Sequence, residues 1–214
     1  MLAEELLGLG ADGAPRHSTA LLAAVERAAE AAGGWGAVER IAVGLGPGSF
    51  AGIRIGIATA RGLAASTGLP VSGVCTLDAL GQALGEAAAG TSRPRLATLD
   101  ARRGEVFAAL YSAAGERTWE PFVASPEELA KRLAGLPGAP LAGGAGAVRF
   151  RHELASRGVE IPGDADPVHR VAARHVCALA ASGRERAGGR LEPLYLRPPD
   201  AQRWRERDTA TRPR

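Results

Sequence analysis

The segment GLGPGSFAGIRIGIATARGLA, residues 44–64, is the part of this chain that points most clearly to a fold class. It continues the short apolar run of residues 41–45, turns at a cluster of Gly and Pro, and then repeats apolar residues at helical spacing. A run of this kind before a tight turn is typical of a buried strand. We therefore predict a strand, a tight loop and a helix in succession.

The elements around this segment extend the same alternation. A helix is predicted from residues 17–19, where Ser18 or Thr19 can cap it, to the glycines at 33–34. Residues 70–74 follow as a second buried strand, and a further helix covers residues 76–84 with Thr76 as its cap. Strands that alternate with helices indicate an α/β protein.

The second half of the chain begins after a polar break at residues 90–94. We predict a hairpin of strands 96–100 and 106–111, a helix from the cap Ser125 to about residue 134, a strand with a glycine turn at 141–147, and a last helix within 169–183. The break divides the chain into an N-terminal lobe of residues 1–93 and a C-terminal lobe of residues 94–200. Residues 201–214 are expected to form a disordered basic tail.

Composition narrows the protein class. Of the 214 residues 46% are hydrophobic, enough for one domain or two small lobes. The opening is acidic and interrupted by Gly, and no stretch approaches the roughly 18 apolar residues of a membrane span, so we expect a cytoplasmic protein without membrane contact. The two cysteines form no CxxC pair, and the formal charge of +3 comes from dispersed Arg, which is weak evidence for RNA binding.

Three interpretations compete for the Gly-rich loop. Backbone amides at Gly46, Gly48 and Ser49 could bind an anion at the start of the helix. A Walker A loop is excluded because no Gly-Lys-Ser/Thr follows, and a dinucleotide site is disfavoured because the strand at 71–74 carries no acidic residue at its end. The remaining interpretation is an ordinary turn made by Gly46 and Gly48, which this segment alone favours over both nucleotide sites.

The helix after the loop carries small residues at a spacing of four, Gly52, Gly56 and Ala60. Each interior Gly costs a helix about 1 kcal/mol relative to Ala, a cost that close packing against another helix could offset. The ridge therefore indicates either an interface between subunits or ordinary packing inside the lobe.

Catalytic and metal-binding patterns are not evident. The four histidines, at positions 17, 152, 169 and 175, lack the spacing that places two imidazoles on one helix face. Ser49 lacks a G-x-S-x-G frame. Asp100 could be a metal or phosphate carboxylate, but an Asp at a strand end more often starts a turn. We expect neither a metal site nor a catalytic set.

Several blocks together resemble the TsaB (YeaZ) family. The hallmark segment at residues 44–64 continues into TLDALGQAL at 76–84, and further agreement comes from RHSTALLAAVERAAEAAG at 16–33, LDARRGEVFAALY at 99–111 and PLYLRPPDA at 193–201. These blocks follow the family order and cover most of the chain.

The resemblance implies an actin-like, ribonuclease-H-like (ASKHA) α/β fold of two similar lobes. It further implies a non-catalytic platform that binds the catalytic subunit TsaD and, through that pair, the ATPase TsaE and tRNA. The pathway adds threonylcarbamoyl to the adenosine beside the anticodon. No cofactor of its own is expected, although a nucleotide could sit at the subunit junction, and the isolated chain could form a homodimer.

Family members form their dimer surface from their first two helices. These helices correspond to residues 18–32 and 52–64 of this chain. The resemblance thereby implies the following interface residues: Leu21, Ala24, Val25, Ala28, Gly52, Arg54, Ile55, Gly56, Thr59 and Ala60.

The sequence departs from the family pattern at its N-terminus. Family members usually open with a strand reading roughly ILAIDTST and a paired second strand, whereas this chain begins with MLAEELL. We therefore expect a first lobe truncated at its N-terminus, through a wrongly assigned start codon or a truncated gene model. Two alternative functions stay open: a glycoprotease-like peptidase, and a nucleotide- or RNA-binding module.

Overall fold

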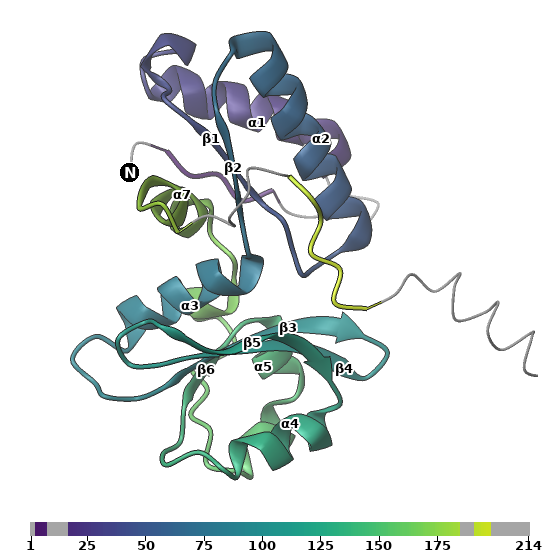
Figure 1. Ribbon diagram of the computed structural model, residues 1–214, viewed down its shortest axis with the longest axis vertical. Helices are drawn as coiled ribbons and strands as arrows, with labels where there is room; N and C mark the ends of the chain where they lie inside the picture. The colour runs from purple at the N-terminus through teal and green to yellow at the C-terminus, as the bar shows by residue number, and fades with distance from the viewer. Residues whose placement is uncertain (1–2, 8–16, 185–190, 198–214) are drawn as a thin grey trace, which may run out of the picture.

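A computed structural model describes residues 3–7, 17–184 and 191–197 of the chain. Figure 1 shows the helices and strands gathered around two separate sheets, one of two strands and one of four. The predicted disordered tail, residues 201–214, lies outside the described residues.

The two-stranded sheet contains the segment from which the fold class was predicted. Strand β1, Ile41–Gly44, pairs in parallel with β2, Val71–Val74, and helix α2, Phe50–Thr67, connects them. Helix α1, His17–Ala31, packs against α2 and ends before two glycines with positive φ. The predicted strand, loop, helix and strand are confirmed, as is the first helix, whereas its proposed Ser or Thr cap falls on side chains outside the described part.

The four-stranded sheet has the order β5-β4-β3-β6. Strands β3, Arg95–Arg102, and β4, Glu105–Tyr111, form the predicted antiparallel hairpin, and β6, Leu141–Gly143, runs parallel to β3. Helix α4, Pro126–Leu133, begins with the expected cap, because Ser125 and Glu128 exchange side-chain to backbone hydrogen bonds.

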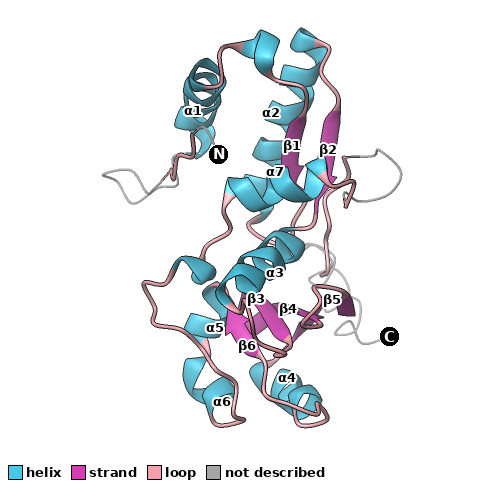
Figure 2. Cartoon of the chain, turned by 90° about the vertical axis from the view of Figure 1, so that its left-hand side faces the viewer, coloured by secondary structure: helices cyan, strands magenta, loops and turns pink. Residues whose placement is uncertain are grey.

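Strand β4 lies in the middle of this sheet and is buried on both faces. Its alternate residues belong to two different cores: Phe107 and Tyr111 pack with helix α3, Thr76–Ala87, while Val106 and Leu110 face α4 on the opposite side. The sheet is thus sandwiched between helices, as Figure 2 shows.

Helix α7, Ala173–Ala181, connects the two halves. It packs against β1 and β2 of the first sheet and also against α3, and Val176 and Leu179 share a core with Val74. Contacts therefore cross the polar break at residues 90–94. The division into lobes at residue 93 stays a prediction.

The structure corrects the sequence-based elements in two places. Strand β5, Arg117–Ala124, was not predicted. Thr76 does not cap α3: residue Cys75 occupies that position without a side-chain cap, and the Thr76 hydroxyl instead accepts a hydrogen bond from the Gly46 amide at 3.1 Å. The short elements that sequence analysis also missed are η1 (Trp35–Ala37), α5 (Ala145–Arg149), α6 (Arg151–Ala155) and η2 (Pro167–His169).

Candidate interaction site

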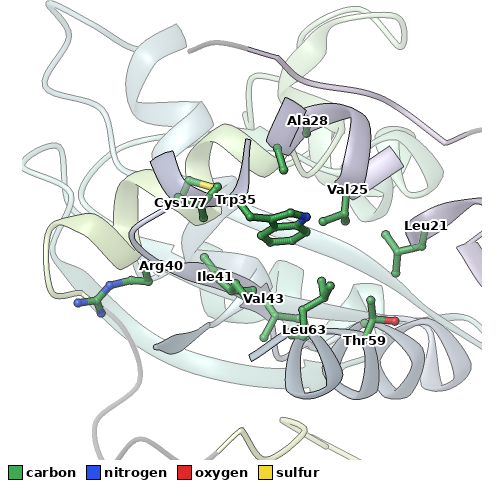
Figure 3. Close-up of a pocket in the computed structure, with 15 residues that line it drawn as sticks. Leu21, Val25, Ala28, Trp35, Arg40, Ile41, Val43, Thr59, Leu63 and Cys177 are labelled. Carbon is green, nitrogen blue, oxygen red and sulfur yellow. The ribbon is translucent and has the colours of Figure 1, made fainter. Parts of the chain in front are cut away.

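An apolar cavity of about 320 Å³ separates α1 from α2 and β1. Figure 3 shows the indole of Trp35 reaching between side chains of α1 and those of β1 and α2. Nearly all lining side chains are aliphatic or aromatic, with Arg40 at one end. The cavity is therefore suited to apolar contact rather than to polar chemistry.

Six of the ten predicted interface residues line this cavity. Helix α1 contributes residues at helical spacing, and α2 contributes the small side of its ridge, where a Cβ at Gly56 would lie 3.6 Å from Val43. Ala60 is itself buried. The six residues brought together are Leu21, Val25, Ala28, Gly56, Thr59 and Ala60.

The other four predicted interface residues lie elsewhere. Ala24 is buried, and Ile55 is half-buried. The Gly52 amide donates to the Ser49 hydroxyl at 3.3 Å, which caps α2. Arg54 is exposed and turns toward Tyr195. Gly56 and Ala60 of the ridge thus face α1 and β1 within the chain, while Arg54 is exposed on a different side of α2.

One edge of β1 borders the cavity. The Ile41 amide donates to Pro70 at 2.9 Å and the Leu45 amide donates to Val74 at 2.8 Å, so alternate residues face β2. The backbone groups of Ala42 therefore point away from β2, and Ala42 lines the cavity. Among the described strands, only β2 pairs with β1.

Residues 3–7 connect α1 to α7. Glu5 forms an ion pair with Arg27 at 2.7 Å, and Glu4 accepts hydrogen bonds from the backbone amide and the guanidinium of Arg174. The backbone hydrogen bond from Arg174 holds the pKa of Glu4 below its ordinary value. Leu6 in this segment remains exposed.

The Gly-rich loop is tied into the fold by its own backbone. The Gly46 carbonyl accepts from the Thr76 amide at 2.8 Å, and its amide donates to the Thr76 hydroxyl. Gly46 has a φ of 101°, and a Cβ there would lie 2.8 Å from Ile53. Gly48 and Ser49 are exposed at the loop tip. The geometry fits a tight turn, and anion binding at the loop stays a prediction.

An exposed aromatic cluster beside the loop was missed by sequence analysis. Phe50 and Tyr195 stack with ring centroids 5.3 Å apart, and the Arg54 guanidinium lies 3.8 Å above the Phe50 ring. Arg54 also donates to the Tyr195 hydroxyl at 2.9 Å. Tyr195 is 141 residues from Arg54, so no local pattern could have joined them.

Asp100 starts a turn, as the sequence favoured. Its carboxylate accepts from the Arg102 amide at 2.8 Å and pairs with Arg149 at 2.9 Å.

Within the described residues, no group of three His, Cys, Asp or Glu side chains could hold a metal ion. No helix in that part of the chain is long and apolar enough to span a membrane.

Neither thiol carries the signature of an activated nucleophile. Burial raises the pKa of the Cys75 thiol to about 11, and burial also raises the pKa of Cys177. An activated cysteine shows the opposite shift, because its thiolate is stabilised by nearby positive charge or a helix N-terminus.

Comparison with known proteins identifies the relatives of this chain. The TsaD family, described as tRNA N6-adenosine threonylcarbamoyltransferase, matches residues 12–156. The Escherichia coli (strain K12) tRNA threonylcarbamoyladenosine biosynthesis protein TsaB is 33% identical over 167 residues, which cover 75% of this chain and 71% of that protein. An uncharacterized protein of Mycobacterium leprae is 41% identical over 92 residues, 43% of this chain, but the match spans only 23% of that protein.

A solved structure confirms the architecture. YeaZ from Pseudomonas aeruginosa superposes with a TM-score of 0.65 at 27% sequence identity, covering 85% of this chain and 86% of that structure. The actin-like α/β fold expected from the sequence is therefore confirmed. Together with the E. coli match, this establishes that the chain belongs to the TsaB (YeaZ) family, whose named relatives are tRNA threonylcarbamoyladenosine biosynthesis proteins.

Proposed function

We propose that this chain is a non-catalytic platform subunit that binds TsaD for the threonylcarbamoyl modification of tRNA in the cytoplasm. The observation that carries the proposal is family membership, because the Escherichia coli relative that aligns over 75% of the chain is named for this pathway. TsaE binds to the complex of this chain with TsaD, and TsaD catalyses the transfer to tRNA. A nucleotide at the subunit junction remains part of the proposal.

The partner surface lies on α1 and α2. On α1, Leu22 is 51% exposed and is one of the exposed large hydrophobic side chains of the described residues. On α2, the solvent-facing residues are mostly small: Ala51, Ala58, Gly62 and Ala65. Small side chains let the backbone of another helix approach closely. This surface supports a helix-to-helix contact without rearrangement of the core.

Resemblance between the two subunits supports this mode of pairing. Because the TsaD family matches residues 12–156, the catalytic partner carries segments equivalent to α1 and α2. Two related folds can pair through equivalent surfaces, as in an isologous dimer. The same geometry would permit a homodimer when the partner is absent.

A peptidase is the weaker alternative. A peptidase that acts through a covalent intermediate would need a cysteine with a lowered pKa or a serine with a positioned base. Burial shifts the pKa of both thiols in the opposite direction, and Ser49 uses its hydroxyl to cap α2.

The test is size-exclusion chromatography with light scattering on this chain mixed with TsaD from the same organism. Gly62→Arg is the informative variant, because a Cβ at Gly62 meets no heavy atom within 4 Å and the fold should tolerate the new side chain. Leu22→Arg probes α1. We expect the mass of a heterodimer for wild type and at least about tenfold weaker association for each variant.

Ala155→Arg is the matched control, since Ala155 is an exposed small residue on α6, part of the other half of the chain. It should bind TsaD like wild type. Separate elution of wild type and TsaD would contradict the proposed partner, and unchanged binding by Gly62→Arg and Leu22→Arg would contradict the proposed surface.

A further inference from the structure

The cluster of Phe50, Arg54 and Tyr195 presents aromatic rings to solvent. Phe50 is 48% exposed and Tyr195 is 41% exposed, and these two are among the most exposed large hydrophobic side chains of the described residues. The Arg54 guanidinium lies against the Phe50 ring and is held there by its hydrogen bond to the Tyr195 hydroxyl. A flat apolar surface with a fixed positive charge results.

Residues 191–197 form a strap that connects this cluster to the turn between β3 and β4. The Leu194 amide donates to the Leu45 carbonyl at 2.7 Å, and Arg197 donates to the Ala101 carbonyl at 2.6 Å. Figure 1 shows the start of α2, the strap and the end of β3 on the same side of the molecule. Tyr195 of the cluster and Arg197 at the turn are only two residues apart along the strap.

The turn adds positive charge in an uncommon backbone conformation. Arg102 and Arg103 have φ values of 63° and 55°, a left-handed region that non-glycine residues rarely adopt. Arg103 and Gly104 form the two-residue loop of the hairpin, and positive φ at both positions is the usual geometry of a type I′ turn. The Arg102 side chain is 82% exposed and lies 3.7 Å from Asp100, which pairs more closely with Arg149.

Asp100 lies within ion-pair distance of both Arg102 and Arg149, while Glu105 pairs with Arg197. We name the surface formed by Phe50, Arg54, Arg102, Arg103 and Tyr195 the aromatic–arginine surface. Its chemistry suits a ligand with both flat rings and negative charge.

We propose that the aromatic–arginine surface binds the unpaired nucleotides of an RNA loop. Unpaired bases can stack on Phe50 and Tyr195 whatever their identity, whereas bases inside a duplex are stacked on each other and hidden. Phosphates would contact the guanidinium groups of Arg102 and Arg103. The identity of the RNA as tRNA rests on the proposed function, but the contact is made by this chain itself rather than through TsaD.

The test is fluorescence anisotropy with the full chain and a labelled RNA hairpin that has an unpaired loop. A blunt RNA duplex of the same length is the comparison. Wild type should prefer the hairpin, and the double variant Phe50→Ala, Tyr195→Ala should bind it at least about fivefold more weakly. Tyr195→Phe keeps the ring but removes the hydroxyl that holds Arg54, so it should bind the hairpin more weakly than wild type and more tightly than the double variant.

The arginines are tested by salt dependence. The double variant Arg102→Ala, Arg103→Ala should reduce the slope of log affinity against log salt by about 0.7 for each phosphate that the variant no longer neutralises. The matched control is Arg132→Ala, because Arg132 lies 4.2 Å over the Phe122 ring in a similar cluster elsewhere on the chain. Arg132→Ala should leave both affinity and slope unchanged.

Several results would overturn the proposal. These are failure of wild type to bind the hairpin, equal binding of hairpin and duplex, or unchanged binding by the aromatic variant. If Phe50→Ala does not fold, Phe50→Leu keeps the apolar side chain without the ring and decides the point. If the aromatic or the arginine double variant loses binding to TsaD but still binds the hairpin like wild type, the surface is a protein interface and not an RNA site. Because RNA binding is measured without TsaD, it can fail independently of the proposed function.

Discussion

Gly144 shows how one residue can be required by the backbone around it. It follows β6 and leads into α5 with a φ of 97°. A Cβ at this position would lie 1.8 Å from the Thr98 carbonyl oxygen and 2.5 Å from Leu80. Neither the backbone of β3 nor the core beneath α3 can move easily, so only glycine fits.

We therefore expect Gly144→Ala to lower the free energy of unfolding by more than about 3 kcal/mol, measured by urea denaturation. Gly163→Ala is the control, because a Cβ at Gly163 meets no atom within 4 Å. Its effect should stay within about 0.5 kcal/mol. Equal effects of the two substitutions would contradict the packing described at Gly144.

Single residues of the candidate site differed in how well they could be predicted. Leu21, Val25 and Ala28 were expected at a subunit interface, and the structure places them along one cavity, so their role in an interface stays a prediction. Arg54 belonged to the same predicted set, but its partner Tyr195 comes from the far end of the chain. Contacts of that range depend on the tertiary fold and leave no local pattern.

At the scale of elements, periodicity and turn residues predicted both parallel strands, the hairpin and five helices. Strand β5 was missed for physical reasons. It lies at the edge of its sheet, only its last residue is buried, and Pro121 interrupts it. An edge strand of this kind lacks the alternation that marks a half-buried strand.

The packing of α7 on α3 contains a buried histidine. His175 is 1% exposed, its Nδ1 lies 3.4 Å from the Glu86 carboxylate, and its Nε2 has no hydrogen-bond partner in the described part of the chain. Burial lowers the pKa of His175, and Arg174 acts in the same direction, while Glu86 and Glu4 oppose it. The folded chain therefore favours the neutral imidazole.

The packing of α7 on α3 around His175 should contribute less to stability at acidic pH. Below the ordinary histidine pKa of 6.5 the unfolded chain binds a proton that the folded chain resists, so the free energy of unfolding falls as the pH falls. We expect a smaller decrease in Tm between about pH 7 and pH 5 for His175→Gln than for wild type. His152→Gln, on the exposed side of α6, should keep the wild-type slope. The same slope in all three proteins would exclude His175 as the cause.

At the scale of the whole molecule, α7 and the strap join the two sheets into one unit. The strap contacts α2 through Arg61, β1 through Leu45 and the β3–β4 turn through Arg197. Two exposed faces of this unit are the α1 and α2 surface and the aromatic–arginine surface. We propose that the first binds TsaD and the second contacts RNA, so a single platform would hold enzyme and substrate together.

Reconstituted tRNA modification would show whether this chain acts as such a platform. TsaD from the same organism, TsaE, threonylcarbamoyl-adenylate and unmodified tRNA are combined with and without this chain, and threonylcarbamoyladenosine is measured by mass spectrometry. We predict modification only when both TsaD and this chain are present. Modification by TsaD at the same rate without this chain, or by this chain without TsaD, would contradict the platform role.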